Sequence, residues 1–86
     1  MYRILYSPLA RKDSKKIEES HLKLKCLELL NIIAINPYQN PPPYEKLIGD
    51  LKGFLSRRIN IQHRMVYKVC EKERIIKLYR MWSHYD

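Results

Sequence analysis

The stretch from Gly53 to Val69, GFLSRRINIQHRMVYKV, indicates how the second half of the chain folds. Apolar and polar residues alternate on both sides of a short polar segment, a pattern that is typical of a β-hairpin. We expect residues 60–62 to form the turn and the second strand to end at Val69 or Cys70. Successive side chains along each strand should then point to opposite faces of a sheet.

Three arginines lie on the predicted hairpin, Arg57 and Arg58 on its first strand and Arg64 at the start of its second. If residues 60–62 form the turn, Arg58 lies opposite Arg64 and both side chains share one face of the sheet. Like charges so placed are unfavourable unless an anion lies between them, and the planar guanidinium group matches a phosphate. The pair therefore predicts a phosphate-binding site, which a one-residue change of register would destroy. Arg57 should face the other way.

The first part of the chain predicts a strand followed by two helices. Tyr2 to Ser7 is a short aromatic and aliphatic run, typical of a strand. Ser7 can cap a helix and proline suits the first turn, so we expect a helix from Pro8 to Glu19 with a basic surface. A second helix, from His21 to Ile35, carries apolar residues every three or four positions and is therefore predicted to be buried.

The proline-rich segment from Tyr38 to Asp50 is expected to be stiff and irregular, because prolines cannot donate hydrogen bonds to a central strand. It carries Glu45 directly before the hairpin. A last strand is expected from Arg74 to Ser83. These elements predict an α+β fold in the order β-α-α-β-β-β. Two N-terminal helices pack on one face of a mostly antiparallel four-stranded sheet, and the other face is left free as a basic surface.

Length and charge restrict the kinds of protein that this chain can be. Its 86 residues predict one domain, residues 1–86, with one core. The 17 Lys and Arg against 9 Asp and Glu give a formal net charge of +8, which favours a polyanionic partner. No apolar run approaches the roughly 18 residues of a membrane span, so we expect a cytoplasmic protein. Cys26 and Cys70 are expected to be reduced core cysteines.

Glu45 and His84 could carry out acid–base chemistry on a phosphate that the arginines hold. RNA supplies its own nucleophile, the 2′-hydroxyl beside the scissile phosphate. Cleavage then needs a base for that hydroxyl, cations for the crowded phosphorane and an acid for the departing 5′-oxygen. A glutamate, two arginines and a histidine supply all three without a metal, and no residues have zinc-like spacing.

Two motifs and the end of the chain resemble a known family. Leu51 to Ile59 has the form L-x-G-F-x-S-R-R-I, His63 to Tyr67 has the form H-R-x-V-Y, and His84-Tyr85 follows the last strand. All three are characteristic of the Txe/YoeB toxins of the RelE/ParE toxin–antitoxin superfamily. The resemblance implies a microbial RNase-like, RelE-like fold. It also implies a ribosome-dependent endoribonuclease that cuts mRNA in the A site, needs no cofactor, and is inhibited by a YefM-type antitoxin. Some toxins of this type also self-associate, so a homodimer is possible.

The resemblance also implies roles for single residues. Glu45 matches the family's general base and His84 its general acid. Arg64 matches the arginine that stabilises the transition state, and Arg58 a supporting phosphate-binding arginine. Tyr85 matches a C-terminal active-site tyrosine, which the residues alone do not single out.

Lys46 and Arg57 complete the set of candidate phosphate-binding residues.

Three positions depart from the family pattern. Ile48 replaces a lysine of the family, with Lys46 nearby, and Gln62 replaces the glutamate that often precedes His-Arg. Asp86 extends the chain past the tyrosine. These departures could lower the rate or change positioning, but they leave the base, the arginines and the acid in place.

Other functions are compatible with part of the pattern. A basic surface can be merely solvated, or belong to a non-catalytic nucleic-acid-binding module. A superfamily toxin could also act on a protein target such as gyrase, although that branch lacks this set of Glu, Arg, His and Tyr. Tyr79 and Trp82 could stack bases, whereas Tyr67 is expected in the core and His63 in solvent.

Overall fold

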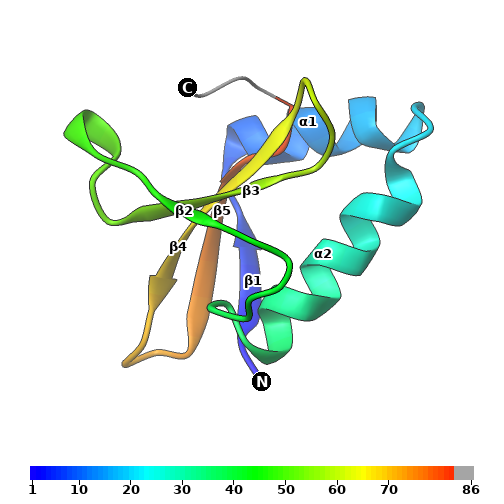
Figure 1. Cartoon of the computed structure of the whole chain (residues 1–86). Coiled ribbons are helices and arrows are strands. Elements are labelled where there is room, and N and C mark those ends of the chain that lie inside the picture. The colour runs from blue at the N-terminus through cyan, green and yellow to red at the C-terminus, as the bar shows by residue number, and fades with distance from the viewer. Residues whose placement is uncertain (83–86) are drawn as a thin grey trace.

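Five strands form one mixed sheet in the order β1-β5-β4-β3-β2 in the computed structural model, which describes residues 1–82 (Figure 1). Only β1 and β5 run parallel; the other neighbouring strands are antiparallel. The prediction of a mostly antiparallel α+β sheet is therefore confirmed. The strands are β1 (Arg3–Tyr6), β2 (Glu45–Lys46), β3 (Phe54–Arg58), β4 (Arg64–Cys70) and β5 (Ile75–Arg80).

The strand β2 is the element that the sequence did not predict. It is two residues long, lies at the edge of the sheet against β3, and crosses the front of the view in Figure 1. The prolines end at Pro43, so the chain regains the backbone N–H groups that pairing requires. Just beyond β2, Leu47 N donates to the Phe54 carbonyl at 2.9 Å. The sheet therefore has one strand more than the four expected.

Both predicted helices are present. The helix α1 spans Pro8–Glu18, and the Ser7 hydroxyl caps it by accepting a hydrogen bond from Ala10 N at 3.0 Å. The helix α2 spans Lys23–Ile35 and begins two residues later than predicted. A single 3-10 turn, η1 (Gly49–Leu51), precedes β3.

The two helices cover the same face of the sheet, as predicted, because their buried residues join one core with alternate residues of the strands. Within residues 1–82, no helix is long and apolar enough to cross a membrane. Cys26 lies in this core as a free thiol, and burial raises its pKa to about 11. The core includes Ala10, Ile17, Cys26, Leu29 and Ile33 from the helices and Leu55, Met65, Tyr67, Ile76 and Leu78 from the sheet.

The hairpin of β3 and β4 has the register on which the arginine argument depends. Arg58 pairs with Arg64, and Ser56 pairs with Val66. The turn is held by Asn60, whose side-chain oxygen accepts hydrogen bonds from the backbone N–H groups of Gln62 and His63 at 2.9 and 2.7 Å. An Asx-type turn of this kind explains why the polar segment ends the strand where it does.

Candidate active site

Glu45, Arg58 and Arg64 come together on the face of the sheet that the helices leave open. Arg58 and Arg64 share this face because they are directly opposite on β3 and β4. Glu45 pairs with Ser56, which lies two residues before Arg58 on β3, so its side chain points the same way. The Glu45 carboxylate contacts the Arg64 guanidinium at 3.1 Å between Oε1 and Nη2.

The two arginines of this site are held very differently. The Arg64 side chain is only 13% exposed, and its Nε donates to the Ser56 hydroxyl at 2.7 Å. Arg58 is exposed, and no hydrogen bond or ion pair to it occurs within the part of the chain that the structure describes. Arg64 is therefore oriented before any ligand arrives, whereas Arg58 is available to pair with an incoming anion.

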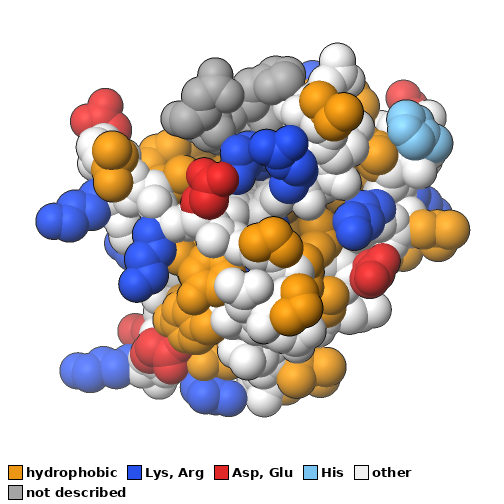
Figure 2. All heavy atoms as spheres, in the orientation of Figure 1, with side chains coloured by type: hydrophobic (Ala, Val, Ile, Leu, Met, Phe, Trp, Pro, Cys, Tyr) orange, Lys and Arg blue, Asp and Glu red, His pale blue; other side chains and the backbone are white. Residues whose placement is uncertain are grey.

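The three side chains line an open pocket of about 240 Å³ together with Pro43 and Tyr44. Because the Glu45 side chain is 62% exposed, its ion pair with Arg64 is worth about 0–1 kcal/mol, so a phosphate group can compete for the arginine. A carboxylate beside two guanidinium groups can accept a proton next to a bound phosphate. Figure 2 shows Lys and Arg side chains spread over the face seen in Figure 1, with apolar patches between them.

Arg57 lies on the other side of β3 and is 1% exposed. Its Nε donates to the Tyr67 hydroxyl at 2.9 Å, and its Nη atoms donate to the carbonyls of Pro37 (3.1 Å), Gln39 (2.8 Å) and Pro42. The prediction that it faces away from Arg58 is confirmed. Its inclusion among the phosphate-binding residues is wrong, because protein acceptors already occupy the guanidinium.

The contacts of Arg57 instead hold the loop that leads to Glu45. The loop's carbonyls surround the guanidinium, which also lies 5.0 Å from the centre of the Tyr44 ring. Tyr67 is fully buried, as predicted, and donates to the Pro37 carbonyl at 2.7 Å. Burial raises the pKa of the Tyr67 hydroxyl, and the neighbouring Arg57 offsets this only in part. The stiffness expected from prolines thus has a second source in a buried cation.

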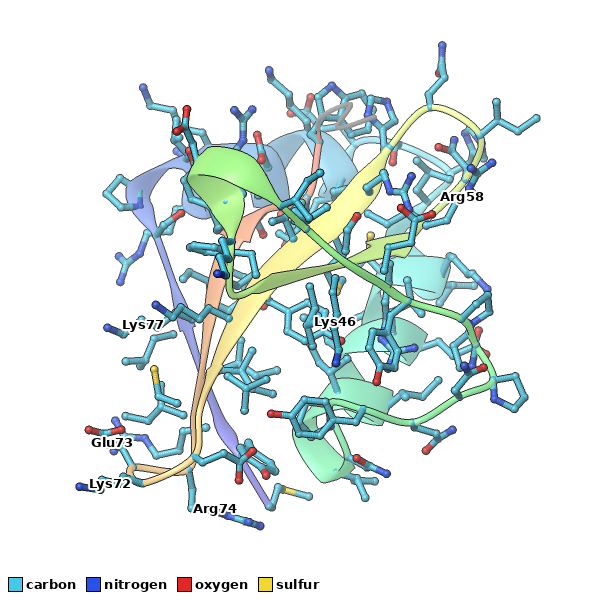
Figure 3. The ribbon with its side chains drawn as sticks, turned by 60° about the vertical axis from the view of Figure 1, so that its left-hand side comes forward. Lys46, Arg58, Lys72, Glu73, Arg74 and Lys77 are labelled. Carbon is cyan, nitrogen blue, oxygen red and sulfur yellow. The ribbon has the colours of Figure 1, made fainter. Side chains whose placement is uncertain are left out.

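Lys46 is not brought to the pocket of Glu45. It pairs with the core residue Leu55, so its side chain lies on the opposite face of β2 from Glu45. Figure 3 shows it pointing away from the region of Arg58. It lines a separate hollow of about 570 Å³ that also includes Ile48, which is 87% exposed. The lysine and the position that departs from the family pattern therefore share this second hollow.

His84 and Tyr85, the candidate acid and its neighbour, lie outside the described residues, as does Asp86. Ser56 is a site residue that the sequence reasoning missed. Its signal was its position, since a residue two before Arg58 in a strand shares the face of Arg58. Within residues 1–82, no three His, Cys, Asp or Glu side chains cluster closely enough to hold a metal ion.

The model of one protein family, described as the YoeB-like toxin of bacterial type II toxin–antitoxin systems, matches residues 9–85. The chain belongs to this family. A curated relative, Toxin YoeB of Synechocystis sp., is 33% identical over 76 residues, which cover 86% of this chain and 88% of the relative.

Solved structures of the family have the same fold. The YoeB chain of a heterotetrameric YoeB–YefM complex from Staphylococcus aureus is 35% identical, with a TM-score of 0.82 and 99% of each chain covered. The YoeB/ParE toxin from Agrobacterium tumefaciens has a TM-score of 0.88 at 24% identity, covering 96% of this chain and 99% of that toxin. The YoeB-like, RelE-type fold predicted from the motifs is therefore confirmed for this family member.

Proposed function

We propose that this YoeB-family toxin is a ribosome-dependent endoribonuclease that cleaves mRNA in the A site and so inhibits translation. The observation that carries the proposal is the Glu45 carboxylate 3.1 Å from Arg64, with Arg58 opposite Arg64 on the same face. A base beside two cations is the arrangement that attack by a 2′-hydroxyl on its own phosphate requires.

In the proposed reaction, Glu45 takes the proton of the 2′-hydroxyl and the freed oxygen attacks the adjacent phosphorus. Arg64 and Arg58 stabilise the negative charge that builds up on the phosphorane oxygens. The bond from phosphorus to the 5′-oxygen then breaks, and His84 donates a proton to that oxygen. The products are a 2′,3′-cyclic phosphate and a 5′-hydroxyl end, with no metal ion or cofactor involved. Tyr85 is proposed to complete the site beside His84.

The exposure of Glu45 supports a reaction in which another macromolecule holds the RNA in place. The Glu45 side chain is 62% exposed, so among the described residues the candidate base alone does little to align a free RNA strand for in-line attack. We propose that the ribosome supplies this alignment, which places the action in the cytoplasm. The net charge of +8 suits binding to such a polyanion.

The same charge suits an acidic protein inhibitor. Because the S. aureus relative forms a complex with YefM, we propose a YefM-type antitoxin as the cognate partner of this chain. A second S. aureus structure is a YoeB dimer, 35% identical with a TM-score of 0.81 and 98% of each chain covered. We propose that this chain also forms a homodimer, which light scattering of the purified toxin would detect.

Primer extension on a translated message tests the enzyme assignment. The unmodified toxin should cut inside codons only when ribosomes are present, and Glu45→Gln should reduce the rate by about 10²–10⁴-fold. Glu73→Gln is the matched control, because Glu73 lies in the β4–β5 turn, at the other end of the sheet from Arg58 (Figure 3). Full cleavage by Glu45→Gln would refute the role of Glu45. Growth arrest with intact mRNA and a DNA-damage response would instead indicate a protein target such as gyrase.

A further inference from the structure

The buried carboxylate of Asp13 on α1 accepts hydrogen bonds from the backbone just after β5, at the end of the described residues. Asp13 is 1% exposed, although burying an unpaired carboxylate is costly. Its Oδ2 accepts hydrogen bonds from Met81 N at 2.9 Å and from Trp82 N at 3.2 Å. The strand β5 has ended at Arg80, so these two N–H groups lie beyond its ladder and Asp13 satisfies them instead.

Arg80 completes this contact as the counter-ion. Its Nε donates to Asp13 Oδ2 at 2.8 Å and its Nη2 to Oδ1 at 3.2 Å. Burial opposes the ionisation of Asp13, but the hydrogen bonds from Arg80, Met81 and Trp82 outweigh it, so the pKa of the carboxyl is lowered from its usual value. Asp13 is therefore a carboxylate at neutral pH. Its hydrogen bonds with the backbone of Met81 and Trp82 weaken only as the pH falls through that lowered pKa.

The Trp82 side chain is held from the hairpin side. Its ring stacks on the His63 ring, with 3.8 Å between centroids and 20° between planes. The prediction that the His63 side chain lies in solvent is therefore wrong. His63 directly precedes Arg64. Residues 81 and 82 are therefore fixed both to the helix layer, through Asp13, and to the hairpin that carries the candidate site.

We propose that Asp13 is a positioning residue for the cleavage reaction, which it serves by fixing the backbone of Met81 and Trp82. The candidate acid His84 follows Trp82 by only two residues in the sequence and Tyr85 by three, so this anchor fixes the part of the backbone that directly precedes them. A stretch of two residues spans at most about 7 Å. The inference rests on the proposed endoribonuclease function and assigns a role to a residue far from the motifs that define the family pattern.

The variant Asp13→Asn tests the anchor, because one of its two oxygens becomes a donor facing Arg80. Glu18→Gln is the matched control, since Glu18 is an exposed acid on the same helix. Trp82 is the only tryptophan among seven tyrosines, so fluorescence excited at a wavelength that tyrosine does not absorb reports on this point alone. Asp13→Asn should shift Trp82 emission to longer wavelength and increase quenching by acrylamide, while Glu18→Gln leaves both unchanged.

Cleavage on programmed ribosomes supplies the second readout. For Asp13→Asn we expect the single-turnover rate at saturating toxin to fall about 10-fold or more, because general acid catalysis is worth about 10²–10⁴ when correctly positioned. The toxin concentration giving half the maximal rate should change less than about twofold, since Arg58 and Arg64 are untouched. A merely structural role would lower the thermal midpoint and leave the rate per folded molecule unchanged.

Each outcome decides between the readings. A slower rate with unchanged Trp82 emission, or altered emission at the full rate, overturns the positioning role. If the unmodified toxin does not cleave mRNA on ribosomes, the proposed function itself is wrong. Failure of the proposed function can therefore be told apart from failure of the positioning role of Asp13. If Asp13→Asn does not fold, hydrogen exchange of the unmodified toxin decides: the amides of Met81 and Trp82 should be protected, and rapid exchange of both would refute the anchor.

Discussion

Arg57 and Arg58 are neighbours in the sequence but lie in opposite environments of the molecule. Arg57 is 1% exposed and donates to four protein acceptors, whereas Arg58 is exposed and lines the candidate pocket. Alternation along β3 is the cause, since adjacent side chains in a strand point to opposite faces. Two identical side chains thus stand on two sides of one strand, one in a structural network and one in a site.

The buried side of β3 supports the exposed side. Arg57 binds three carbonyls of the loop that leads to Glu45, and Glu45 in turn reaches the pocket shared with Arg58. An arginine-rich motif is therefore not a uniform anion-binding surface. Only the residues that share a face with Glu45 can bind phosphate beside it, so substitutions on the two faces should have different effects.

The largest expected effect is on stability. Arg57→Met should lower the free energy of unfolding by about 2–4 kcal/mol, because loop carbonyls and the Tyr67 hydroxyl lose their donor and only some regain water. Arg58→Met should change it by less than about 0.5 kcal/mol, as is usual for exposed positions. Urea denaturation of the two variants measures both values. Equal losses would mean that the two arginines do not lie in different environments.

The next effect is on cleavage and concerns Arg58. Arg58→Met should slow ribosome-dependent cleavage by about 10- to 100-fold, since a hydrogen bond to a charged group contributes about 1.5–3 kcal/mol. Arg58→Lys should retain part of the rate, because lysine keeps the charge but lacks the planar fork. Single-turnover rates measure this series, with Lys72→Met as the control for loss of one positive charge at the far end of the sheet (Figure 3).

A smaller effect is expected at Ser56, which holds Arg64 from below. Ser56→Ala removes the acceptor of the 2.7 Å hydrogen bond from Arg64 Nε. Ser56 acts on the reaction only through the orientation of Arg64, so we expect a loss of about 0.5–1.5 kcal/mol, less than for direct loss of a charged donor, and cleavage slower by about 2- to 12-fold. An unchanged rate, together with unchanged stability in urea, would show that Arg64 needs no such support.

The smallest effect is expected at Lys46. Lys46→Met should alter the cleavage rate by less than about twofold, because the side chain lies on the face opposite Glu45 and exposed charges contribute little. The same single-turnover assay measures it beside Arg58→Met. A loss of rate as large as that of Arg58→Met would mean that Lys46 contacts the RNA. Its position on the opposite face of β2 from Glu45 would then not keep it out of the site.

Sequence by itself determined the elements whose signals are local. Three such signals depend only on neighbouring residues, and the structure contains all three elements that they predict. They are the Ser7-Pro8 cap, the apolar stripe of α2 and the polar turn of the hairpin. The turn also set the register that pairs Arg58 with Arg64, because strand pairing extends outward from it. The choice of Glu45 beside those arginines came from the same local signals and from the family motifs.

Tertiary structure decided which of these charged residues face the site. The short pairing of β2 with β3 turns Glu45 toward Arg64 and Lys46 away from it, and no pattern in a proline-rich segment predicts an edge strand of two residues. The burial of Arg57 depends on carbonyls 15 to 20 residues earlier in the chain, and the anchor on Asp13 joins residues 67 to 69 positions apart. Such contacts form only when the helix layer closes on the sheet, because a buried charge is stable only where distant polar groups converge on it.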